Sequence, residues 1–158
     1  MSNDLKFKIS HKITDDNSSN FTIKPLDRGY GITIGNSLRR ALLTAVPGAA
    51  ITNVKIEGAH HEFSTIDGVT EDVADIIMNL KGVRFHLFES KVEPIFLKVK
   101  GPKAFTAADI QAASNDFTIL NLNHHITDVA KGTTLEVELR LGIGKGYKSS
   151  EENKLNNS

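Results

Sequence analysis

The sequence predicts an α+β fold, with mostly antiparallel sheets and two main helices. Apolar and polar residues alternate in several short segments, most clearly from Leu135 to Leu141, which is the period of a half-buried strand. Two other segments, 33–46 and 70–80, place their apolar residues at helical spacing instead. A short polar turn between the first two strands indicates an antiparallel hairpin. Segments of this kind are typical of sheets combined with separate helices.

The chain begins with the hairpin and continues into the first helix. Residues 7–13 and 21–23 alternate in polarity on either side of a polar cluster, 15–20, which is typical of a turn. A helix is then expected to begin at Thr33, a residue type that caps helices well. It should stop before Pro47, which cannot continue a helix.

The second helix follows a β-rich stretch. Residues 51–56 have irregular apolar spacing, which predicts a bulge or bend, and residues 60–66 are expected to be extended. Thr70 should cap a helix that runs to Leu80, with acidic residues near the positive end of its dipole. Gly82 is expected to end it in a left-handed conformation. One apolar face of this helix contains Val73, Ile76, Ile77 and Leu80.

The remainder is mostly β-structure. Strands are expected over 83–87, 95–99, 117–119 and 135–141, with one helical turn near 107–110. The polar residues 148–158 are expected to be disordered.

Composition limits the function classes. Lys plus Arg and Asp plus Glu each total 19, so the net charge is zero, unlike domains that mainly bind nucleic acid through a basic excess. No direct DNA contact is therefore expected. The chain has no cysteine, which excludes disulfides and thiolate metal sites. It has no apolar run of the ~18 residues that span a bilayer, so we expect a cytoplasmic protein without a membrane partner.

The first helix has two distinct surfaces. At 100° per residue, an apolar stripe contains Ile34, Leu38, Ala41, Leu42, Ala45 and Val46. Arg40 and Leu43 lie off this stripe and are neighbours on the helix surface because they are three residues apart. Such a pair can contact a partner. Spacing alone favours a solvated arginine beside an incidental exposed leucine.

Other motifs give no catalytic, metal or cofactor site. His60-His61 and His124-His125 are poor chelating pairs, because adjacent residues on a strand point to opposite faces. Glu71, Asp72 and Asp75 are explained by a solvated helix start. The run 142–147, GIGKGY, lacks the spacing of a phosphate-binding loop. No nucleophile lies in an evident pairing with a base.

Several longer motifs carry a family resemblance. The principal one is PLDRGYGITIGNSLRRALL, residues 25–43. The other matching segments are 47–52, 54–58, 61–65, 68–73, 79–83 and 107–110. Over residues 7–148 the chain resembles the amino-terminal assembly domain of the bacterial RNA polymerase alpha subunit.

The resemblance implies a scaffold that dimerises and recruits the beta and beta-prime subunits of a nucleotidyltransferase whose active site lies in other subunits. It implies that Arg40, with Leu43 and Arg39, contacts beta. It implies that Lys81, with Leu80, contacts beta-prime. Residues implied in dimer or core packing are Tyr30, Ile34, Leu38, Ala41, Leu42 and Ala45.

The resemblance also implies a domain organisation. Residues 1–48 would be the first part of a dimerisation subdomain, 49–147 an inserted β-rich subdomain and 148–158 a disordered tail. The returning part of the dimerisation layer and a DNA-binding domain would be missing, which would weaken the homodimer. The motifs favour a bacterial cytoplasmic or plastid stromal protein. The alternative is a free-standing interaction or regulatory domain of the same fold that binds polymerase subunits without assembling the core.

Overall fold

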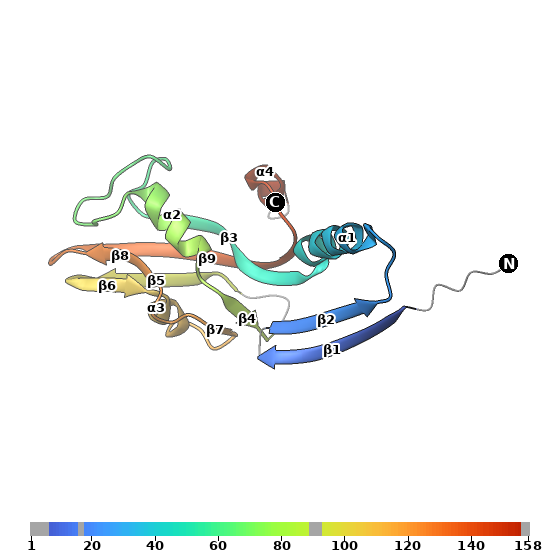
Figure 1. Ribbon diagram of the computed structural model, residues 1–158. Coiled ribbons are helices and arrows are strands. Elements are labelled where there is room, and N and C mark those ends of the chain that lie inside the picture. Colours follow the sequence, from blue (N-terminus) through green and yellow to red (C-terminus); the bar gives the residue numbers. More distant parts are fainter. Residues whose placement is uncertain (1–6, 16–17, 89–92, 156–158) are drawn as a thin grey trace. The chain divides into compact units, whose positions relative to one another are not determined.

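The fold is known from a computed structural model that describes residues 7–15, 18–88 and 93–155. It confirms the predicted α+β class, and every strand pair within its three sheets is antiparallel (Figure 1). The chain divides into two compact units, residues 1–45 and 46–158. The subdomain boundary expected after residue 48 stays a prediction.

The first unit contains a hairpin and a helix. Strands β1 (Lys8–Asp15) and β2 (Ser18–Lys24) pair antiparallel, and the rings of His11 and Phe21 stack with centroids 4.7 Å apart. Part of the predicted turn, residues 16–17, lies outside the described residues. Helix α1 follows over Tyr30–Ala45.

Helix α1 begins three residues before the expected Thr33. The backbone reverses at Gly29, whose φ of 92° suits glycine, and the Tyr30 N–H donates a hydrogen bond to the Asp27 carbonyl (3.1 Å). The turn before the helix therefore closes earlier than the capping pattern indicated. As predicted, the helix stops before Pro47, the first residue of the next strand.

The second unit is built on a five-stranded sheet of order β5-β9-β3-β4-β7. Its strands are β3 (Pro47–Ile56), β4 (Phe85–Leu87), β5 (Ile95–Lys100), β7 (Phe117–Ile119) and β9 (Thr134–Lys145). The register between β3 and β9 shifts between Ile51 and Asn53, which confirms the predicted irregularity.

A smaller sheet and two helices complete the core. Strands β6 (Lys103–Thr106) and β8 (His125–Val129) pair with each other, and the helices are α2 (Val73–Lys81) and α3 (Ala107–Gln111). The largest fully buried side chains are Ile76, Phe105, Ile110, Phe117, Ile126, Thr127, Leu135 and Leu139. Removing an apolar side chain of this size from water contributes about 1.5–3 kcal/mol.

Helix α2 begins later than predicted. Thr70 is not its cap, and lies before the helix, where its N–H donates to the Asp128 carbonyl (3.0 Å). Asp72 is the cap instead, and its Oδ1 accepts a hydrogen bond from the Asp75 N–H (2.8 Å). The extended segment expected at 60–66 is also wrong, since the chain turns there and the Ser64 N–H donates to the His61 carbonyl.

The polar tail contains a short helix, α4 (Ser150–Leu155), where disorder was expected from residue 148. The Ser149 N–H donates to Glu152 Oε2 (3.0 Å), and the Glu152 N–H donates to Ser149 Oγ (3.3 Å). This reciprocal pair is a capping box, which satisfies two backbone donors at a helix start. The Ser-x-x-Glu pattern of a capping box is present in the sequence, but the prediction of disorder rested on the polar composition.

Candidate functional site

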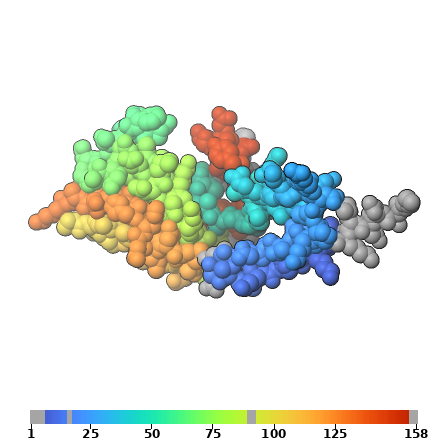
Figure 2. Space-filling model, in the orientation of Figure 1, coloured from blue at the N-terminus to red at the C-terminus, as the bar shows by residue number. Residues whose placement is uncertain are grey.

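The first candidate surface is the Arg40–Leu43 edge of α1. Both side chains are exposed, Leu43 to 61%, and α1 contributes to the molecular surface in the space-filling view (Figure 2). Across the described residues, neither Arg40 nor the adjacent Arg39 forms an ion pair with a carboxylate. The edge thus offers free guanidinium donors next to an apolar side chain, a combination enriched at the centres of protein interfaces.

The second candidate surface is the apolar stripe of α1. Ile34 is half-buried, whereas Leu38 and Leu42 are exposed to 48% and 67%. No described residue of α1 is buried. The remaining predicted dimer or core residues, Tyr30, Ala41 and Ala45, are exposed as well. A helix normally buries such a stripe, so this stripe is the surface that a partner would cover.

The third candidate is the C-terminal end of α2. Lys81, the last helical residue, is exposed and has no carboxylate partner in the described part of the chain. Leu80, predicted beside it as a contact, is only 2% exposed and belongs to the core. Leu80 therefore supports the helix from inside and does not itself offer a contact surface.

The turn at residues 121–124, just before β8, holds this end of α2. His124 Nε2 lies 2.8 Å from the Asn79 carbonyl oxygen and donates to it, because a carbonyl only accepts. Asn121 Nδ2 donates to the Gly82 carbonyl (3.0 Å), and Asn121 Oδ1 accepts from the Arg84 N–H (2.8 Å). The carbonyls that a helix end leaves without partners are satisfied here by side chains.

Gly82 is not the left-handed terminator that was predicted. Its φ of −75° and ψ of −16° are right-handed helical values. A Cβ here would lie 2.5 Å from His124 Nε2, so a side chain at this position would have to displace the imidazole. The imidazole occupies the volume that any other side chain would need.

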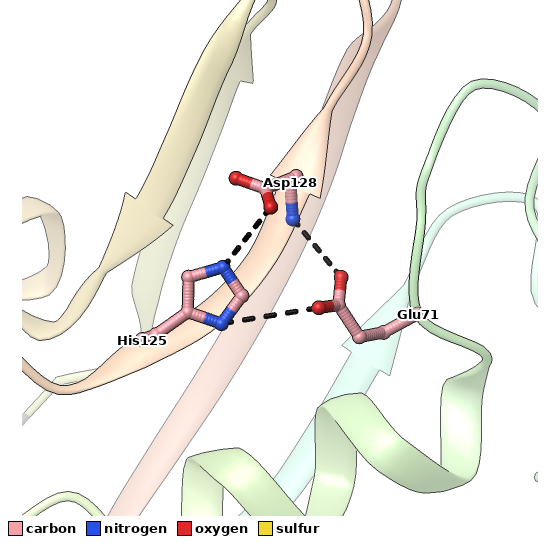
Figure 3. Close-up of side chains that lie close together, drawn as sticks. All are labelled: Glu71, His125 and Asp128. Atoms are coloured by element: carbon pink, nitrogen blue, oxygen red, sulfur yellow. Dashed lines mark hydrogen bonds and ion pairs between the residues drawn. The ribbon is translucent and has the colours of Figure 1, made fainter.

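The approach to α2 is held by a second set of contacts, and Figure 3 shows those among Glu71, His125 and Asp128. Glu71 Oε2 accepts hydrogen bonds from Thr127 Oγ1 (2.6 Å) and from the Asp128 N–H (3.0 Å). His125 lies between the two carboxylates, with Nδ1 3.8 Å from Glu71 Oε1 and Nε2 3.4 Å from Asp128 Oδ2. Two adjacent histidines therefore serve opposite ends of one helix.

These contacts determine the acidity of Glu71. Burial raises the pKa of its carboxyl, but the hydrogen bonds from Thr127 and from the Asp128 backbone, together with His125, lower it more. The net effect is a pKa below the ordinary value, so the folded chain favours the charged carboxylate. Glu71 and Thr127 are 56 residues apart, and no local pattern in the sequence reveals their hydrogen bond.

The same three side chains are metal-ligating types, since one ligand atom from each lies within 4.8 Å of the others. The Glu71 carboxylate already accepts hydrogen bonds from a hydroxyl and a backbone N–H. These bonds link the segment before α2 to β8, and this structural role accounts for the cluster. We assign it no metal or cofactor.

Comparisons with known proteins place the chain in a family. The family model for the RNA polymerase Rpb3/RpoA insert domain matches residues 54–158. The chain belongs to this family. A DNA-directed RNA polymerase subunit alpha from Salinibacter ruber is 52% identical over 139 residues, covering 88% of this chain and 42% of the relative. The subunit from Limosilactobacillus reuteri is 50% identical over 145 residues, covering 91% and 46%.

The chain spans less than half the length of these curated relatives. The Rpb3/RpoA match includes the end of α2 with Lys81, whereas α1 with Arg40 lies before the matched residues. Within the family region, the glycine run 142–145 is not a loop. It continues β9, where Gly142 and Gly144 pair with Ala50 and Gly48.

The described helices are too short or too polar to cross a membrane.

Proposed function

We propose that this chain is the assembly part of an alpha subunit of DNA-dependent RNA polymerase. In this role it is a non-catalytic scaffold that dimerises and recruits the beta and beta-prime subunits in a bacterial cytoplasm or plastid stroma. One observation carries the proposal. The aligned stretches cover 88–91% of the chain, and 50–52% of their residues are identical to those of alpha subunits. The unpaired Arg40–Leu43 edge supports it.

The proposal gives the two surfaces of α1 different partners. The apolar stripe Ile34, Leu38, Ala41 and Leu42 meets a second alpha subunit, because apolar area of this kind favours association. The Arg40–Leu43 edge, with Arg39, binds beta. Lys81 at the end of α2 approaches beta-prime. The zero net charge argues against DNA as a direct partner of this part of the subunit.

The test is capture of purified beta by the immobilised chain. Arg40→Ala removes an interface arginine and should weaken capture by tenfold or more, the range of residues that dominate interfaces at about 2 kcal/mol. Arg140→Ala is the matched control, since it removes an exposed arginine whose ion pair among the described residues is with Glu138. Capture that is equal for both variants would show that Arg40 does not bind beta.

A further inference from the structure

Lys81 is exposed at the C-terminal end of α2, and side chains from another segment form hydrogen bonds with this helix end. Helix C-termini leave their last carbonyls without partners and tend to fray. Here, the single turn at 121–124 supplies His124 to the Asn79 carbonyl and Asn121 to the Gly82 carbonyl. These two contacts lie on either side of Lys81 in the sequence.

The turn is itself anchored on both sides. The His124 N–H donates to the Asn121 carbonyl (3.0 Å), and the Ala107 N–H of α3 donates to the His124 carbonyl (2.9 Å). In the other direction, Asn79 Nδ2 donates to the Ile126 carbonyl of β8 (2.9 Å). The end of α2 and the turn therefore hold each other, and both are tied to the buried core.

We propose that His124 and Asn121 are positioning residues, which fix the last turn of α2 so that Lys81 is presented in one place to a partner subunit. The inference rests on the proposed contact between Lys81 and beta-prime. Binding through a side chain costs less when its backbone origin is already ordered. His124 thus acts on the partner through Lys81 and makes no contact of its own with it.

The neighbouring histidine provides a matched control. His125 faces Glu71 and Asp128 at the opposite end of α2 and makes no hydrogen bond to its last turn among the described contacts. Replacement of either histidine by alanine removes the same atoms. Only His124→Ala should loosen the helix end that positions Lys81.

The first measurement uses the free chain. Hydrogen exchange is followed at the Gly82 and Val83 amides, which donate to the Asn79 and Leu80 carbonyls. His124→Ala should raise exchange there by about tenfold while core amides stay protected. Gly82→Ala should do the same by displacing the imidazole, whereas His125→Ala should not. His124→Gln, whose amide can still donate to Asn79, should restore protection. Unchanged exchange in His124→Ala overturns the inference whatever the chain binds.

The second measurement uses purified beta-prime, added to the chain already bound to beta. Lys81→Ala and His124→Ala should each weaken capture by about tenfold, and the double variant should bind no more weakly than Lys81→Ala alone. If the two losses add, His124 does not act through Lys81, and the inference fails while the Lys81 contact stands. If Lys81→Ala binds normally, the proposed beta-prime contact fails, and the presentation of Lys81 to that partner fails with it.

Discussion

In the second unit, buried hydrophobic residues come from both sheets and from α2 and α3, whereas no described residue of the first unit is buried. The first unit is not short of apolar side chains, since Ile9, Ile13 and Phe21 on the hairpin and Leu38 and Leu42 on α1 are large and exposed. Regularly spaced apolar residues therefore have two different outcomes in this chain. In one unit they make a core, and in the other their side chains are left exposed.

The largest expected difference between the units is in stability. Phe105→Ala removes a fully buried ring and should lower the free energy of unfolding by about 3–5 kcal/mol. Leu42→Ala on α1 removes an exposed side chain and should change it by no more than about 0.5 kcal/mol. Urea unfolding followed by circular dichroism measures both. Equal losses of unfolding free energy for the two variants would mean that Leu42 is packed as tightly as Phe105, and that the two units do not differ in this way.

The stripe should instead govern association. Leu38→Ser combined with Leu42→Ser should weaken self-association by about tenfold or more, because both remove apolar area from the uncovered face. Sedimentation at several concentrations measures the change, and the melting temperature should stay nearly constant. A chain that sediments as a clean monomer before mutation would argue against the stripe as an interface.

A smaller effect is expected at Glu71 and depends on pH. Its pKa is lowered in the folded chain, so the stabilisation is fully present above the ordinary value of 4.5 and is lost as pH falls through the folded value. Glu71→Gln should cost about 1 kcal/mol at pH 7, as expected for a partly exposed hydrogen-bonded carboxylate. The variant should also flatten the decline of stability below pH 4.5. Parallel pH profiles for both proteins would contradict the assignment.

The smallest effect is expected in α4. Ser149→Ala removes one half of the capping box and should destabilise this short helix by about 0.5–1 kcal/mol, with the rest of the second unit unaffected. Faster hydrogen exchange at the Glu152 amide, without a shift in global unfolding, is the expected signature. No change at that amide would remove the capping explanation for the helix.

The sequence predicted the elements whose signals are local. Alternation located β5, β7 and β9, and helical spacing identified the buried face of α2 with Val73, Ile76 and Leu80. The family motifs identified the chain, because they are long and in order. The contact roles of Arg40 and Lys81 are tested by neither the fold nor the comparisons and stay predictions.

Features that depend on distant parts of the chain were not predictable. The segment before α2 is tied to a distant strand, where the Thr70 N–H donates to the Asp128 carbonyl, and the helix is capped by Asp72 instead. The role of Gly82 was misread because the reason for a glycine there is the ring of His124. Leu80 was expected both on the apolar face of α2 and beside Lys81 as a contact, and its 2% exposure agrees with the apolar face.

The pairing of β3 with β9 has a consequence for how this protein is made. Pro47 and Lys145 are register partners, so the chain enters the five-stranded sheet and completes it at the same position. Strand β9 also pairs with β5 and lies between it and β3. Of these five strands β9 is thus the last to leave the ribosome, so β5 has no partner in this sheet until then and β3 has only its short pairing with β4. Contacts of such long sequence separation slow folding, and they leave unpaired strand edges exposed during synthesis.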